Sequence, residues 1–240
     1  MELQRERISS FTKYPFSIPS IRSLEQIEFK NKITFFVGEN GSGKSTLLEA
    51  IAEMCGFNTA GGGRNNHYQV HRAESALAPY IRLSWWPKVT NGFFLRAESF
   101  YNFATHIDEM WEEDKVNAYE AYGGKSLHEQ SHGESFLSLF LNRFRGGAIY
   151  LLDEPEAALS PQKQLSFLKI LHDLTTNSNC QFIIATHSPI LLGYPGATIF
   201  SFDDGTIKEI QYEETDHYQI TRYFLENRRK FLRELLKEEE

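Results

Sequence analysis

Residues 38–46 read GENGSGKST, and the segments on either side of this stretch decide the fold. The preceding run, ITFFV at 33–37, is short, apolar and rich in β-branched and aromatic residues, which predicts a buried strand. The following run, STLLEAIA at 45–52, has helical composition and no breaker. A strand, a glycine-rich loop and a helix in this order predict a phosphate-binding loop, because the loop N–H groups and the helix N-terminus attract anions.

Each part of this stretch has a task in holding a nucleotide. The three glycines let the backbone turn tightly and approach an anion closely. Lys44 can reach the β- and γ-phosphates, the Ser45 hydroxyl can ligate Mg²⁺, and Thr46 is expected beside the α-phosphate. The predicted nucleotide-binding residues are Gly38, Glu39, Asn40, Gly41, Ser42, Gly43, Lys44, Ser45 and Thr46.

A second motif, AIYLLDEP at residues 148–155, is an apolar strand that ends in two carboxylates. A buried strand delivers its last residues to the carboxyl edge of a parallel sheet, where ligands bind in this architecture. Asp153 is therefore predicted to hold Mg²⁺, and Glu154 to polarise an attacking water. The alternative is a solvated acidic turn, which the phosphate-binding loop upstream disfavours.

The order of motifs resembles an ABC-type ATPase, and most of all the stand-alone bacterial AAA/ABC-type ATPases of the P-loop NTPase superfamily. The family signature, L-S-G-G-Q, lies just upstream of the second motif, where this chain reads QSHGES at 130–135. Ser131 and Gly133 match the signature, whereas His132 and Glu134 depart from it. The resemblance implies that these four residues contact the γ-phosphate of a nucleotide bound to a second copy of the chain.

The same resemblance assigns three further segments. In ATHSP, at 185–189, His187 takes the position of the switch histidine and is expected to sense the γ-phosphate. EAALS, at 156–160, corresponds to the D-loop, with Ser160 in place of the usual Asp. Glu98 falls at the Q-loop position, where a glutamate is unusual, so both a metal or water contact and a helix N-terminal charge remain open.

Several of these residues also have an ordinary structural interpretation. Ser131 and Glu134 have the spacing of a helix capping box, which is compatible with a phosphate-facing helix N-terminus. His187 fits a core histidine as well as a phosphate-facing loop, although the Ser-Pro break after it favours the loop. Tyr14 and Phe16 are candidates either for stacking on adenine or for the core.

Composition sets limits on the class of protein. With 240 residues, 41% of them hydrophobic, the chain is long enough and apolar enough for a substantial core. A net charge of −7 disfavours a broad nonspecific nucleic-acid surface. Two isolated cysteines, a charged N-terminus and no apolar stretch near the ~20 residues of a membrane span predict a cytoplasmic protein without membrane insertion.

The chain is expected to form one ATP-binding domain over 1–240, with a helical signature-bearing subdomain near 98–145 and a charged helical tail at 214–240. The predicted elements are a β-rich start over 1–32, a hairpin from 81–86 and 92–95, helices at 98–115, 134–144 and 161–177, and strands at 182–186, 197–202 and 206–211 with a turn at 204–205.

Together, the motifs and the resemblance predict an α/β P-loop NTPase fold of the ABC-ATPase kind, with a mainly parallel sheet, flanking helices and a small antiparallel β lobe. The expected activity is Mg²⁺-dependent ATP hydrolysis, with ATP driving a two-fold homodimer that controls a partner protein or a nucleic acid. Two alternatives remain open: the nucleotide-binding subunit of a membrane transporter, and a nucleotide-gated binding module with negligible turnover.

Overall fold

The computed structural model describes residues 1–59, 61, 75–85, 89, 91–97, 100, 104–105, 108, 132–143 and 147–236. Its centre is a six-stranded sheet in the order β4-β5-β6-β2-β7-β8. The first five strands run parallel, and β8 pairs antiparallel with β7. The strands are β4 (Asn91–Arg96), β5 (Ala148–Asp153), β6 (Gln181–Ala185), β2 (Ile33–Val37), β7 (Thr198–Ser201) and β8 (Lys208–Ile210).

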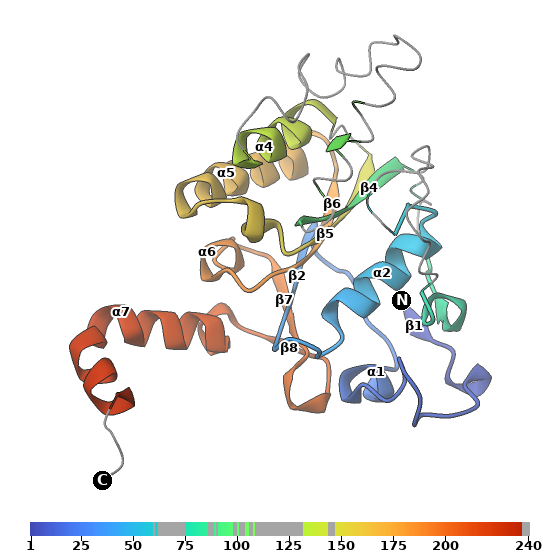
Figure 1. Ribbon diagram of the computed structural model, residues 1–240. Coiled ribbons are helices and arrows are strands. Elements are labelled where there is room, and N and C mark those ends of the chain that lie inside the picture. The colour runs from blue at the N-terminus through green and yellow to red at the C-terminus, as the bar shows by residue number, and fades with distance from the viewer. Residues whose placement is uncertain are drawn as a thin grey trace.

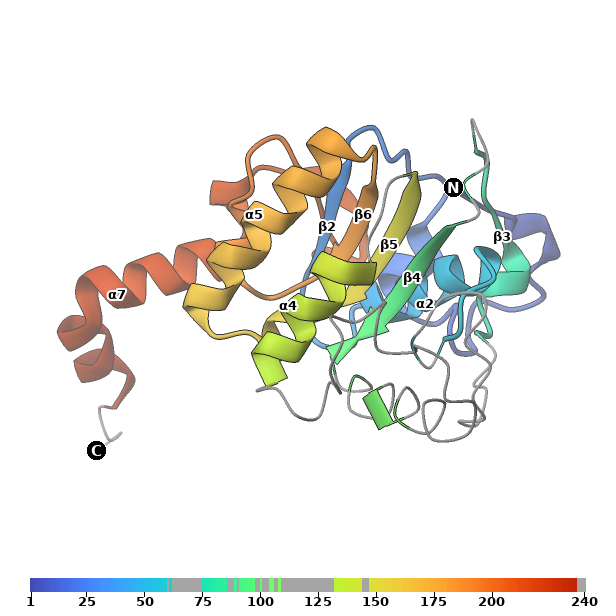
Figure 2. The same ribbon diagram turned by 90° about the horizontal axis from the view of Figure 1, so that it is seen from above.

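Helices cover both faces of this sheet (Figures 1 and 2). One face carries α4, α5 and α6, and the other carries α1 and α2. A separate two-stranded antiparallel sheet pairs β1 with β3 beside the α2 face. These elements are α1 (Pro19–Ser23), α2 (Lys44–Met54), α4 (His132–Arg143), α5 (Pro161–Asn177), α6 (Pro189–Leu192), β1 (Glu2–Leu3) and β3 (Ile81–Arg82).

Alternating side chains of the buried strands fill the two cores. Phe35 packs with α4, α5 and α6, whereas its neighbour Phe36 packs with α1 and α2. Phe93 and Phe94 of β4 divide between the same two cores. All five residues of β2 are buried, as in a strand covered on both faces. The predicted α/β class with a mainly parallel sheet and a small antiparallel part is confirmed.

The C-terminal helix α7 (Asp216–Leu235) extends from the body of the domain (Figure 1). None of its residues is fully buried, and its backbone departs from helical geometry at Asn227, where φ is −126°. At its start Thr215 caps the helix by accepting from the backbone N–H of Tyr218. The predicted helical tail is therefore present, within slightly narrower bounds.

Two element predictions are wrong. The first 32 residues are not β-rich, because β1 is the one strand among them and α1 takes part of the rest. The hairpin between 81–86 and 92–95 does not form: β3 pairs with β1, and β4 pairs in parallel with β5 over six residues. Apolar strand patterns identify strands but do not say which neighbour they pair with. The predicted helix at 98–115 lies outside the residues that the structure describes.

Candidate nucleotide-binding site

The phosphate-binding loop connects β2 to α2 at the carboxyl edge of the sheet. Gly43, the residue before the helix, has φ 103°, and a Cβ on it would lie 2.9 Å from the Ser20 hydroxyl oxygen. This position therefore requires glycine for its conformation and for its close neighbours. The helix begins at Lys44, so its free N–H groups face the loop.

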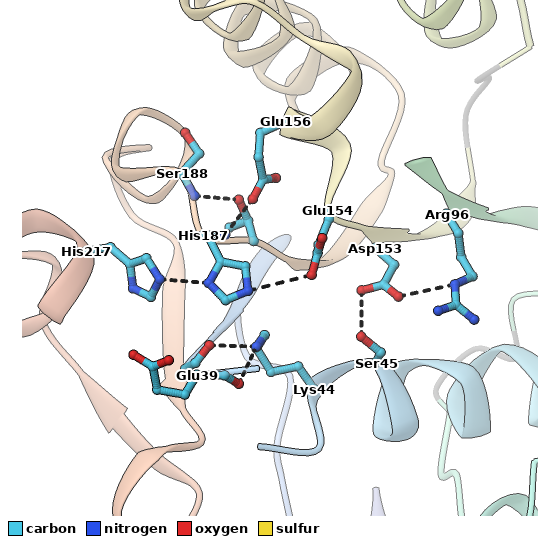
Figure 3. A network of polar contacts seen from close by, with 12 residues as sticks. Glu39, Lys44, Ser45, Arg96, Asp153, Glu154, Glu156, His187, Ser188 and His217 are labelled. Carbon is cyan, nitrogen blue, oxygen red and sulfur yellow. Dashed lines mark hydrogen bonds and ion pairs between the residues drawn. The ribbon is translucent and has the colours of Figure 1, made fainter. Parts of the chain in front are cut away.

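Lys44 extends back over this loop (Figure 3). Its Nζ donates to the carbonyl oxygens of Gly38, at 2.6 Å, and Glu39, at 2.9 Å. Only 4% of the residue is exposed, and burial lowers the pKa of its ammonium group while the carboxylates of Glu154 and Asp153 oppose that shift. The loop backbone thus holds this cation at the mouth of an anion-binding turn.

Two side chains outside the loop fix its backbone. The Asp203 carboxylate, which follows β7, accepts from the Glu39 backbone N–H at 2.9 Å. The Ser20 hydroxyl of α1 donates to the Ser42 carbonyl oxygen. Neither residue was predicted from the sequence, although Asp203 is a carboxylate two residues after a strand.

Asp153 ends β5 and lies beside the start of α2 (Figure 3). The Ser45 hydroxyl donates to its Oδ1 at 3.0 Å, and Arg96 Nε lies 3.5 Å from Oδ2. Burial raises the Asp153 pKa to about 6, against the lowering effects of Arg96 and the Ser45 hydrogen bond. Arg96 also binds Glu49 on α2 through a 2.6 Å contact. Arg96 was not predicted from the sequence, because its proximity to Asp153 follows from the unexpected β4–β5 pairing.

The Ser45–Asp153 pair fits a magnesium ion bound mainly through nucleotide phosphates. Mg²⁺ keeps several waters and takes only one or two carboxylates besides phosphate oxygens. A hydroxyl and a buried carboxylate 3.0 Å apart offer that sparse donor set. In the described part of the chain, no group of three or more His, Cys, Asp or Glu side chains forms a metal site of its own.

We expect Asp153→Asn to stabilise the nucleotide-free protein at neutral pH. The folded pKa of about 6 exceeds the ~3.9 of an unfolded chain. The contribution of Asp153 to stability is therefore most favourable below about pH 4 and is lost as the pH rises through about 6. The gain should be about 1–3 kcal/mol at pH 7 and should vanish near pH 4. Arg96 keeps Glu49 as a partner in this variant.

Urea unfolding of both proteins from pH 4 to pH 7 measures this difference. If the variant is less stable than the parent at pH 7, burial of the charged Asp153 carboxylate does not destabilise the folded protein, and the prediction is wrong.

Glu154 follows directly in an unusual backbone conformation. Its φ of 52° and ψ of 51° are left-handed, which is disfavoured for a residue other than glycine. Its N–H donates to the Ala185 carbonyl at the end of β6, 2.9 Å away. Its side chain is 45% exposed, and Oε1 lies 3.6 Å from His187 Nε2. A strained backbone at such a position favours a functional role.

His187 lies just after β6, and it makes one contact with a carboxylate and one with an imidazole (Figure 3). Its backbone N–H donates to Glu156 Oε1 at 2.5 Å. Its Nδ1 lies 2.8 Å from Nε2 of His217, the second residue of α7. The sequence placed Glu156 in the D-loop segment but did not predict its contact with His187, and it gave no role to His217.

The signature segment is described only in part. Ser131 and Glu98 lie outside the described residues, and α4 begins at His132. Gly133 is buried: a Cβ on it would lie 2.6 Å from Lys163 Cδ and 3.1 Å from the Ala158 carbonyl oxygen. Glu134 lies in the first turn of α4 and is exposed. The contact of the four signature residues with a second copy remains a prediction.

The two candidate aromatics separate clearly. Phe16 belongs to the core, with its ring 4.9 Å from that of Tyr80. Tyr14 is 66% exposed, and its hydroxyl lies 3.3 Å from the Thr46 hydroxyl at the end of the phosphate-binding loop. Tyr14 therefore remains the candidate for contact with a nucleotide base.

The chain is similar to several known proteins. The AAA_23 family, described as an AAA domain, matches residues 7–240. The tungstate uptake system ATP-binding protein TupC of Campylobacter jejuni is 27% identical over 79% of this chain and 58% of its own length. The xylose import ATP-binding protein XylG of Moorella thermoacetica is 24% identical over 84% of this chain and 44% of its own length. The chain thus spans about half the length of these curated relatives.

A solved structure, the SMC head domain from Thermotoga maritima, is 18% identical with a TM-score of 0.41, covering 79% of this chain and 92% of that one. Among the described residues, no helix is both long and apolar enough to cross a membrane. The family match includes every site residue discussed above.

Proposed function

This chain belongs to the AAA_23 family, within the ABC-type P-loop ATPases, and we propose that it binds Mg-ATP at the carboxyl edge of its sheet and hydrolyses it. One observation carries the proposal: three neighbouring strands bring a buried lysine, a hydroxyl–carboxylate pair and a carboxylate–imidazole pair to one edge. These are Lys44 after β2, Ser45 with Asp153, the last residue of β5, and Glu154, which follows β5, with His187, which follows β6 (Figure 3).

The residues divide the work of phosphoryl transfer, which needs positioning and charge neutralisation more than covalent help. Lys44 would exchange its two carbonyl partners for the β- and γ-phosphate oxygens. Ser45 and Asp153 would hold Mg²⁺, which neutralises phosphate charge when bound. Glu154 would accept the proton of the attacking water, and His187 would donate from Nε2 toward the γ-phosphate.

We further propose that residues 1–240 act as one cassette, with the region 98–145 carrying the signature and 214–240 forming an appended tail. Two copies would close on two ATP molecules, with Ser131, His132, Gly133 and Glu134 of one copy facing the γ-phosphate in the other. The domain is assigned to the cytoplasm, where ATP is available. Its dimer would then act on a partner protein or a nucleic acid.

We expect Gly133→Ala to prevent ATP-driven association while the chain still folds and binds ATP. The added methyl group would displace the flexible end of Lys163 and lie 3.1 Å from the Ala158 carbonyl oxygen. Light scattering with Mg-ATP measures the association, and thermal melting checks the fold. A Gly133→Ala protein that dimerises like the parent would exclude this surface from the interface.

A transporter subunit is the second candidate, and the relatives favour it about as strongly. TupC and XylG are named as ATP-binding proteins of an uptake system and an import system. To distinguish the two candidates, the tagged protein is incubated with membranes or with soluble extract in the presence of a non-hydrolysable ATP analogue, and the captured proteins are identified. Capture of an integral membrane protein would support the transporter subunit, and nucleotide-dependent capture of a soluble partner would support the first candidate.

A gated module without turnover is the third candidate. The placement of Glu154 beside His187 argues against it.

Steady-state phosphate release with Mg-ATP tests the proposed activity directly. The wild-type chain should release phosphate continuously, and omission of Mg²⁺ should stop it. Binding of Mg-ATP without any release above the background of an empty preparation would leave only the gated-module reading.

A further inference from the structure

The C-terminal helix contributes a side chain to the catalytic edge. His217, in the first turn of α7, reaches the ring of His187 across 30 positions of sequence. The ring centroids lie 4.9 Å apart, and the ring planes are inclined at 51°. The rings meet through their nitrogens, with His187 Nδ1 2.8 Å from His217 Nε2. Figure 3 shows His217, His187 and Glu154 in a row, with His187 in the middle.

The segment before α7 holds His217 firmly in place. The Tyr212 hydroxyl donates to the Pro189 carbonyl oxygen at 2.9 Å, only two residues after His187. The Thr215 hydroxyl donates to the Tyr212 carbonyl oxygen at 2.8 Å, and Thr215 caps the helix that carries His217. The first contact ties the loop of His187 to the segment before α7, and the second fixes the turn that leads from this segment into the helix.

The neighbours of His187 determine which of its nitrogens carries a proton. Burial and the nearby Lys44 ammonium lower the pKa of both imidazoles, so both rings are neutral at pH 7 and each has one N–H. On one side, His187 Nε2 lies 3.6 Å from the Glu154 carboxylate, which accepts hydrogen bonds but does not donate them. The proton of His187 is thus favoured on Nε2, which leaves Nδ1 as an acceptor.

The contact with His217 then has a defined direction. Nδ1 of His187 accepts, so His217 must donate from Nε2, and its own Nδ1 becomes the bare nitrogen. Within the described part of the chain, His217 Nδ1 is buried without a hydrogen-bond partner, as a bare acceptor in this arrangement would be. His187 Nε2 is buried in the same way and is aimed toward Glu154.

We propose that His217 is a positioning residue that holds His187 in the Nε2–H tautomer, directed at Glu154 and at the γ-phosphate position. A lone imidazole would exchange between tautomers and rotate about its side-chain bonds, and only the Nε2–H form donates at that position. Helix α7 is thereby part of the catalytic apparatus, and displacement of its first turn removes the donor that keeps Nδ1 of His187 unprotonated. The proposal rests on the ATPase function inferred above, for which His187 acts as the γ-phosphate donor.

The first test needs no turnover. Protein labelled with ¹⁵N in its histidine rings is examined without nucleotide by long-range ¹H–¹⁵N correlation, with signals assigned through His187→Gln and His217→Gln. Both His187 and His217 should show the Nε2–H tautomer. An Nδ1–H tautomer at His187 would overturn the proposal, whether or not the protein hydrolyses ATP.

The second test uses kinetics. His217→Ala should lower kcat about tenfold while the Kd for ATP stays unchanged. His217→Gln should restore most of the rate, because the glutamine amide can donate from nearly the same place. His172→Gln is the matched control: it makes the same change at an exposed histidine whose contact is the Tyr194 hydroxyl, and it should behave as wild type.

Unchanged kcat in His217→Ala, or equal losses in the alanine and glutamine variants, would overturn the donor role. Absence of phosphate release from the wild type would instead refute the proposed ATPase function, while the tautomer measurement would still decide the role of His217.

Discussion

Glu154→Gln should lower the rate of ATP hydrolysis on the order of 10²-fold or more while ATP binding persists. The glutamine keeps the size of the side chain and its hydrogen-bonding reach but removes the acceptor for the water proton. Glu154 is suited to this task because its side chain is 45% exposed, close to His187 and held by a left-handed backbone that aims it out of the sheet. Phosphate release under saturating Mg-ATP gives the rate, and calorimetry gives the affinity.

Glu209→Gln is the matched control for this variant. Glu209 is an exposed residue of β8 at the far edge of the sheet, and its replacement should leave the rate unchanged. If Glu154→Gln turns over at the wild-type rate, Glu154 is not the base, and the left-handed backbone at this position needs another explanation.

Lys44→Ala should weaken ATP binding by an order of magnitude or more. The Lys44 ammonium is the cation that the phosphate-binding loop holds over its own turn, with hydrogen bonds to two carbonyl oxygens. Its removal eliminates a charge-assisted contact to the β- and γ-phosphates. The two carbonyl oxygens also lose their hydrogen-bond donor. Calorimetric titration with Mg-ATP measures the loss.

Lys169→Ala provides the matched control, because Lys169 is an exposed lysine of α5 whose partner is Asp173 in the same helix. That variant should bind ATP as the wild type does. A folded Lys44→Ala protein with wild-type affinity would contradict the assignment of the loop to phosphate binding.

Local sequence was sufficient for the elements that carry the site. The strand before Gly38, the helix after it, the strand ending at Asp153 and the strand before His187 all form at the predicted places. Parallel strands bring their carboxyl ends to one edge, so positions at those ends could be placed together without coordinates. The roles of these residues in catalysis remain predictions.

Contacts between distant segments could not be read from the sequence. Arg96 meets Asp153 because β4 pairs with β5, whereas the pattern of residues suggested a hairpin. His217 meets His187 because the segment after β8 folds back onto α6, and no periodicity in either segment reports that. The burial of Gly133 against Lys163 also depends on the packing of α4 on α5, which local propensity does not determine.

The most direct test of the account is the mass of Glu154→Gln in solution, measured by light scattering with saturating Mg-ATP, with ADP and without nucleotide. A site completed by a second copy should trap uncleaved ATP between two chains. The account therefore predicts a dimer of the 27.7 kDa chain with Mg-ATP and a monomer in the other two conditions, with Lys44→Ala in the same background remaining monomeric throughout. A Glu154→Gln protein that binds ATP and stays monomeric at high concentration would contradict the two-copy site and favour a heteromeric or transporter-bound assembly.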